Sequence, residues 1–200
     1  GLLPPQHGSG VCRAQHAKLD EVVRIALHVG PEIERGMMPG VAEAGLSHSL
    51  PLADFNTDTT LAVEGRPTER RDGRAHVWYS VVSPGYLDAM RIGQKQGRAF
   101  REGQAEAGSV IVNEAFAREY LAGGGAVGLR VTPDPDEGEW LTIVGVVDDV
   151  RFFGLDQRQT PAAYLPLERY PQRRLFIILR GAGDPNLLGG PLRDAVASLD

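Results

Sequence analysis

Two adjacent acids, Asp148 and Asp149, follow an apolar run at residues 140–147, and Arg151 comes two residues later. Clustered carboxylate oxygens are the ligands that hard divalent cations prefer, so the pair is a candidate metal or catalytic site. On a strand, however, adjacent side chains point to opposite faces, and both carboxylates cannot face one ion without a bend. We therefore expect a polar strand end in which one of the two acids pairs with Arg151.

A second acidic group lies in the turn PDPDEGE at residues 133–139. Its Asp-x-Asp spacing matches the start of a calcium loop, but the twelve-residue spacing to a bidentate glutamate is missing. We expect an exposed hairpin tip with weak, adventitious calcium binding at most. The acids concerned are Asp134, Asp136, Glu137 and Glu139.

The glycine-rich stretch AGGGAVG at residues 122–128 could be taken for a phosphate-binding loop. Such a loop must lead into the N-terminus of a helix, where free N–H groups point at the anion. Here the glycines follow a predicted helix and precede a predicted strand. They are expected to end the helix.

Side chains that could act as nucleophile and base stand together at Ser47, His48 and Ser49. They lie on a predicted strand, and not on the strained turn that carries a hydrolase nucleophile. The single cysteine, Cys12, excludes an intramolecular disulfide and a multi-thiolate zinc site. We assign no catalytic, cofactor-binding or metal-binding residue, because no paired ligand spacing is found among His7, His16, His28, His48 and His76.

The composition is that of a folded globular protein, with 42% hydrophobic and 24% charged residues among 200. The formal net charge of -5 leaves no excess of Lys and Arg to neutralise a phosphate backbone, so no nucleic acid partner is expected. No stretch approaches the roughly 20 apolar residues that span a bilayer. We expect the chain as given to be water-soluble.

The elements that must position these side chains are mostly strands, which predicts an α+β fold in which strands outnumber helices. A leader at 1–15, rich in Gly and Pro, is expected to be loose. An apolar stripe predicts a helix over 18–27. Strands are predicted at 41–50, 59–65, 76–82, 109–112, 140–147 and 174–180, with a hairpin around the 133–139 turn.

Three helix starts are predicted from capping residues. Ser83 with Pro84 is expected to cap a short helix, and Asn113 a helix that buries Phe116. Asp184 with Pro185 opens the last helix in the same way, and the Gly-Gly-Pro run at 189–191 is expected to kink it.

Six phrases occur in an order that is more informative than any single site: VVSPGYLDAMRI, GRAF, VIVNEAFAREYLAGGGAVGLRV, TIVGVVDDVRFFGLD, AAYLPL and AGDP. From about Gly40 to Asp200, this ordered set resembles the periplasmic core domain of MacB-like ABC transporter permeases. The resemblance is closest to the branch of predicted permeases common in acidobacteria.

The resemblance implies a two-part extracytoplasmic domain on the periplasmic or extracellular face of the cell membrane, as part of an inner-membrane permease. A porter-like α+β sandwich would take residues 16–98 and 172–200, and a strand-rich, Sabre-like part would be inserted at 99–171. By the same resemblance, the domain would transmit ATP-driven motion to efflux, release or adaptor engagement, without chemistry or a cofactor of its own. The implied partners are a cytoplasmic ATPase, reached through transmembrane helices absent here, a second permease copy and a periplasmic adaptor.

Two other hypotheses stay open. One is a free-standing periplasmic binding or interaction module, which would need no transmembrane helices beside it. The weaker one is an enzyme that uses Asp148, Asp149 or the 133–139 turn.

Overall fold

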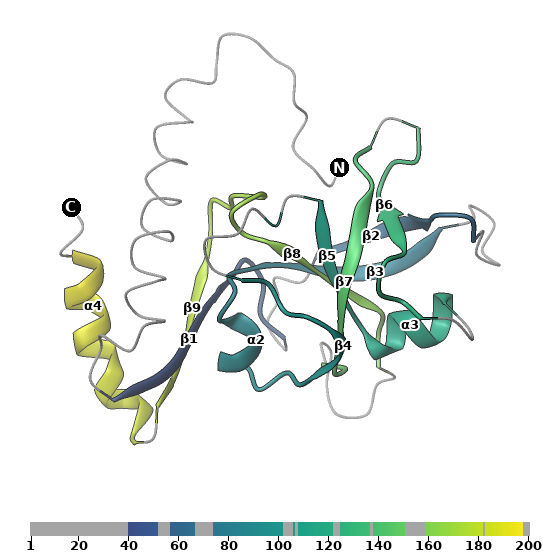
Figure 1. The fold of residues 1–200 in the computed structure, drawn as a ribbon. Helices are drawn as coiled ribbons and strands as arrows, with labels where there is room; N and C mark the ends of the chain where they lie inside the picture. Colours follow the sequence, from purple (N-terminus) through teal and green to yellow (C-terminus); the bar gives the residue numbers. More distant parts are fainter. Residues whose placement is uncertain are drawn as a thin grey trace, which may run out of the picture.

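The structure is a computed structural model in which strands dominate (Figure 1). In the described ranges, nine strands accompany three α-helices and one 3-10 helix, which confirms the predicted α+β class. The structure describes residues 40–51, 57–66, 74–101, 106, 108–121, 125–136, 138–150, 159–181 and 183–197.

Runs of β-branched and apolar residues form most of the strands, and short polar or Gly/Pro-containing segments separate them. The strands are β1 (Val41–Ser47), β2 (Thr57–Val63), β3 (Ala75–Val82), β4 (Gln94–Gly97), β5 (Ser109–Asn113), β6 (Arg130–Thr132), β7 (Leu141–Val147), β8 (Ala162–Pro166) and β9 (Phe176–Gly181). The helices are α2 (Tyr86–Ala89), α3 (Glu114–Tyr120), the 3-10 helix η1 (Pro185–Leu188) and α4 (Gly189–Ala197).

Six of the strands pair in a closed ring. Their order is β2-β6-β7-β5-β8-β3, and β3 pairs with β2 again to close it. The β3–β8 and β5–β7 pairs are parallel, whereas the other pairs in the ring are antiparallel. We call these six strands the ring. β4 pairs with β7 outside this path.

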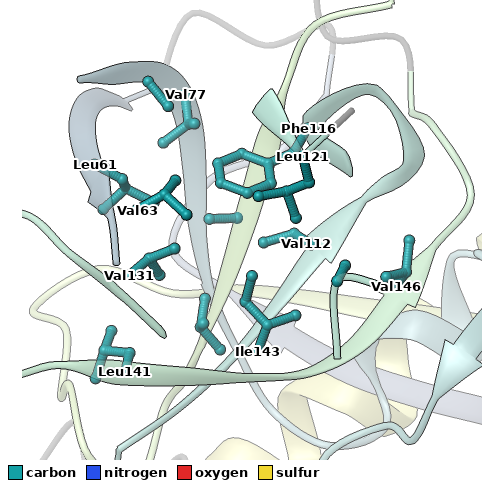
Figure 2. Packing of buried hydrophobic residues seen from close by; sticks show 14 residues of the cluster. Leu61, Val63, Val77, Val112, Phe116, Leu121, Val131, Leu141, Ile143 and Val146 are labelled. Carbon is teal, nitrogen blue, oxygen red and sulfur yellow. The ribbon is translucent and has the colours of Figure 1, made fainter. Parts of the chain in front are cut away.

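The inside of the ring is filled by apolar side chains that every ring strand contributes (Figure 2). Phe116 and Leu121, from α3 and its C-terminal cap, reach into the same cluster, so α3 covers this part of the core. Burial of this many methyl and ring groups is the main stabilising term for the ring. The ring strands contribute Leu61, Val63, Ala75, Val77, Val110, Val112, Val131, Leu141, Ile143, Val146 and Ala163.

Strands β1 and β9 form a second part, which we call the arm. They pair antiparallel over most of their length, and β9 lies at the end of the strand order. In Figure 1 the arm lies beside α4, on the other side of the molecule from α3. Gly45 of β1 lies against the backbone of α2, because a Cβ atom placed there would be 2.4 Å from Cα of Tyr86.

Two apolar clusters connect the arm to the ring on opposite faces of the sheet. In the first, α2 contributes Tyr86 and Leu87, which pack with Ile111 and Tyr164 of the ring and with Ile178 of β9. In the second, the arm strands contribute residues that pack with β3 and with the segment after β8. Members of the second cluster are Leu46, Val81, Leu167 and Tyr170, with Leu175 and Ile177 packed against them.

Several predicted elements are corrected in detail. Ser83 does not cap α2: the cap position is Gly85, without a side-chain hydrogen bond, and the helix starts at Tyr86. The last helix is a 3-10 helix, η1, from Pro185 to Leu188 and then α4 from Gly189, so the run at 189–191 forms the first turn of α4, where proline is tolerated. The strands β4 and β8 were not predicted.

The predicted division into a part at 16–98 and 172–200 and an inserted part at 99–171 stays a prediction. The pairing crosses those boundaries, since β2 and β3 of the first part share the ring with β5 to β8 of the second. The predicted leader at 1–15 and the helix at 18–27 lie outside the described residues.

Candidate functional site

Asp148 and Asp149, the adjacent acids that were candidates for a metal or catalytic site, bind different partners. Asp148 is 41% exposed in its side chain and forms an ion pair with Lys95 of β4 at 2.7 Å. Asp149 is only 4% exposed and accepts a hydrogen bond from the backbone N–H of Ala115 at 2.7 Å. Its other oxygen lies 3.4 Å from Nη2 of Arg118. The expected pairing with Arg151 lies outside the described residues.

Asp149, which follows strand β7, therefore acts as a hydrogen-bond acceptor for the N-terminus of α3. The first N–H groups of a helix lack partners within the helix, and a carboxylate there also meets the positive end of the helix dipole. Asn113 caps the same helix by accepting from the N–H of Phe116 at 3.0 Å, as the sequence predicts. Two side chains thus satisfy two of the free donors.

Replacing Asp149 by alanine should lower the free energy of unfolding by about 2 kcal/mol, because it leaves a helix N–H without its charged acceptor. The change should be visible in urea denaturation followed by circular dichroism. Asp149→Asn keeps an acceptor at the same place and should recover most of the loss.

The neighbouring residue gives the matched control for this prediction. Asp148→Ala removes an exposed ion pair, and exposed pairs contribute little to stability. Its denaturation midpoint should stay close to that of the wild type. Equal losses for the two alanine variants would contradict the different roles assigned to the two acids.

Of the acids in the 133–139 turn, Asp134 stabilises the turn itself. Oδ1 of Asp134 accepts from the N–H of Asp136 at 3.0 Å, and the hydroxyl of Thr132 donates to the carbonyl of Asp134 at 2.9 Å. Glu139 points to Arg169, with the pair at 3.2 Å. Glu137 lies outside the described residues. The turn joins β6 to β7, which confirms the predicted hairpin.

Ser47, His48 and Ser49 do not form a nucleophile and base pair. The hydroxyl of Ser47 donates to the carbonyl of Ser49 at 2.7 Å, and the hydroxyl of Ser49 lies 2.7 Å from that of Ser80 in β3. His48 bonds elsewhere: Nδ1 accepts from the N–H of Val81 at 2.8 Å, and Nε2 lies 2.8 Å from Oγ1 of Thr57. The three residues fasten strands together.

They lie where the arm meets the ring, and we call this place the junction. β1 and β3 share one Cα pair there, Ser47 with Val82. Backbone hydrogen bonds run from Ser83 to Leu46 at 3.0 Å and from His48 to Val81 at 3.1 Å. Side chains lengthen this short ladder at both ends, because Oγ of Ser83 accepts from the N–H of Leu46 at 2.9 Å and His48 accepts from Val81.

Buried hydroxyls also surround the junction. Tyr164 and Tyr170 have buried hydroxyl oxygens without a hydrogen-bond partner in the described part of the chain, and the buried hydroxyl of Tyr86 lies beside the side chain of Ser47. Burial raises the pKa of Tyr86 to about 12, and it raises the pKa of Tyr164 and of Tyr170 as well. These phenols stay protonated at physiological pH, so they contribute polarity without charge.

Two further polar pairs were missed by sequence reasoning. His76 of β3 lies 2.9 Å from Asp58 of β2, on the exposed face of the ring. Glu106 is 5% exposed and is held by both Nη atoms of Arg98, at 2.6 and 2.9 Å, which holds the pKa of its carboxyl below the usual value. Register along paired strands would have brought Asp58 near His76, but that pairing is known only from the fold.

The histidines and the cysteine of the N-terminal segment, His7, His16, His28 and Cys12, lie outside the described residues. Within the described ranges, no three side chains of His, Cys, Asp or Glu gather as a metal ion would require. In the same part of the chain, no helix combines the length and apolar character needed to cross a bilayer.

Comparison with known proteins gives one family. The model of the MacB-like periplasmic core domain matches residues 14–189 of this chain. No curated protein matches the sequence.

Solved structures show the same fold at low sequence identity. The extracellular domain of the ABC-type transporter YknZ from Gram-positive bacteria is 12% identical and superposes with a TM-score of 0.55, over 90% of this chain and 80% of that one. The periplasmic region of MacB from Actinobacillus actinomycetemcomitans is 14% identical, with a TM-score of 0.57 over 96% of this chain and 80% of that one.

Proposed function

The chain belongs to the family of MacB-like periplasmic core domains, the extracytoplasmic domains of MacB-type ABC transporter permeases, and we propose that it transmits ATP-driven motion without chemistry of its own. In this proposal, movement that begins at a cytoplasmic ATPase reaches the domain through transmembrane helices. The domain then drives efflux, release or adaptor engagement outside the membrane.

The observation that carries the proposal is the continuous connection from the ring to the arm. The hydrogen-bonded strands run from β2 to β9 without a break, and apolar clusters cover the junction on both faces. Interiors packed in this way resist compression and transmit strain. A displacement applied to the arm is therefore carried into the ring.

Spin-label distances in the full permease, reconstituted with its ATPase, test this proposal. Leu187 beside the arm is 73% exposed and Val127 beside the ring is 44% exposed, so both accept a label on cysteine without disturbing a core. Cys12 of this domain, and any cysteine in the rest of the permease and its ATPase, is first replaced by serine. Doubly labelled permease is diluted with unlabelled permease, so that the 127–187 distance is measured within one copy.

We expect the 127–187 distance within one copy to stay the same with and without ATP. The distance between Leu187 labels of two copies, measured on singly labelled permease, should change with nucleotide. An unchanged 187–187 distance between copies would contradict motion transmission. So would a result in which nucleotide changes only the 127–187 distance within one copy.

The partners follow the same proposal. A second permease copy and a periplasmic adaptor would contact the domain outside the membrane, and a free-standing module would need neither. Reading the gene on both sides of the segment separates the two hypotheses, because a permease places transmembrane helices beside the domain.

Isothermal titration with calcium, magnesium, zinc and manganese tests the metal-dependent enzyme hypothesis, which predicts heat of binding.

A further inference from the structure

We propose that His48 is a proton-operated latch: its neutral imidazole fastens the arm to the ring, and protonation releases that fastening. His48 is in the right place for this role, since it follows β1 at the junction, where β1 and β3 share a single Cα pair. It also bonds to both adjacent ring strands, to Val81 of β3 and to Thr57 of β2.

The hydrogen bonds fix which form of the imidazole can make this contact. A backbone N–H can only donate, so Nδ1 must be unprotonated to accept from Val81 at 2.8 Å. The ring proton is then on Nε2, which donates to Oγ1 of Thr57 at 2.8 Å. An imidazolium carries a proton on both nitrogens. Protonation therefore turns an N–H toward the N–H of Val81, and the contact is lost.

The surroundings of His48 favour the neutral form. Its ring stacks on Tyr79 of β3, with centroids 5.2 Å apart, and Thr57 has no titratable group. The nearest acid along β2, Asp58, is bonded to His76 instead, and the neighbours along the chain are Ser47 and Ser49. With no carboxylate among these contacts, burial lowers the pKa of His48 to about 4.

The sign of the pH effect follows from this lowered pKa. The unfolded or released imidazole has a pKa near 6.5, so the fastened state binds the proton more weakly than the released state. The contribution of the latch is fully present above about pH 6.5 and is lost as the pH falls toward 4. An extracytoplasmic domain meets the pH of its surroundings, so acidification outside the cell would loosen the arm.

Amide hydrogen exchange on the 200-residue chain, from pH 7 to pH 4, tests the latch. The comparison is His48→Asn, which places an acceptor oxygen where Nδ1 lies but does not titrate. At pH 7 the Val81 amide should be protected alike in the two proteins. At pH 4 its protection in the wild type should fall at least about tenfold below that in the variant, while the amides of Ile111 and Val112 keep theirs.

Each other outcome overturns the latch. Equal protection of Val81 in both proteins at every pH shows that protonation of His48 does not act on the junction. Equal loss at Val81 and in β5 shows global unfolding rather than local release. Should His48→Asn fail to fold, the 15N shifts of His48 in the wild type decide: Nδ1 must be unprotonated at pH 7 and gain its proton in step with the loss at Val81.

Discussion

Replacing Asn113 by alanine should lower the free energy of unfolding by about 3 to 5 kcal/mol, because two buried backbone N–H groups lose their acceptor, at about 1 to 3 kcal/mol each, and the bond to a partly buried carbonyl is lost as well. Asn113 is fully buried. Its Oδ1 accepts from Phe116 at 3.0 Å and from Ala162 at 2.8 Å, and its Nδ2 donates to the carbonyl of Thr160 at 2.9 Å. Urea denaturation at pH 7 measures the loss.

Asn113 joins three elements at one point: the end of β5, the start of α3 and the start of β8. Asn113→Ser separates the local contribution from the long-range one. Serine is a good helix cap but is too short to reach β8, so we expect it to recover about 1 kcal/mol of the loss. If the alanine variant is as stable as the wild type, or if serine restores full stability, the connection to β8 carries no weight.

The elements that could be predicted from the sequence are those that depend on their own residues. The apolar run at 140–147 gave β7, and Asn113 with the apolar spacing after it gave α3 with its cap. β4 was missed because its four residues, QKQG, are all exposed and carry no apolar pattern. They form a strand because the C-terminal half of β7, beyond its pairing with β6, leaves an edge free beside them. Such pairing is a property of the fold.

Side-chain partners were harder to predict for the same reason. Ser83 has the residue type and position of a helix cap, but its hydroxyl accepts from Leu46, 37 residues earlier in the chain. Asp148 or Asp149 was expected to pair with Arg151, which lies outside the described residues, whereas the observed acceptor role of Asp149 is with Ala115, 34 residues earlier in the chain. The local sequence predicts that a side chain will accept a hydrogen bond. The arrangement of the strands determines which backbone N–H donates to it.

The predicted division of the chain into 16–98 with 172–200 and an inserted 99–171 stays a prediction, and strand pairing crosses its boundaries. The predicted boundaries separate β3 from β8, yet these two strands pair in parallel over five residues from Trp78 to Val82. From the pairing, we propose that the mechanical units are the ring and the arm with α2. The spin-label pair at positions 127 and 187 has one label beside each unit, so an unchanged distance would show that the ring and the arm move together.

Replacing Gly45 by alanine should lower the free energy of unfolding by about 3 kcal/mol or more, because overpacking against a rigid partner forces a backbone shift. The added Cβ would lie 2.4 Å from Cα and 2.6 Å from N of Tyr86, and backbone atoms cannot turn aside as a side-chain end can. The arm must therefore move away from α2, which opens the apolar cluster around Tyr86. Urea denaturation gives the loss of stability. The distribution of distances between spin labels at positions 127 and 187 should become broader.

The matched control is Gly183→Ala, since a Cβ at Gly183 meets nothing within 4 Å. This variant should be as stable as the wild type or slightly more so, because alanine restricts the unfolded chain. If the 127–187 distance distribution is broad in Gly45→Ala and not in Gly183→Ala, contact between β1 and α2 holds the arm in place. If Gly45→Ala is as stable as Gly183→Ala, that contact is loose, and the arm cannot carry motion into the ring through α2.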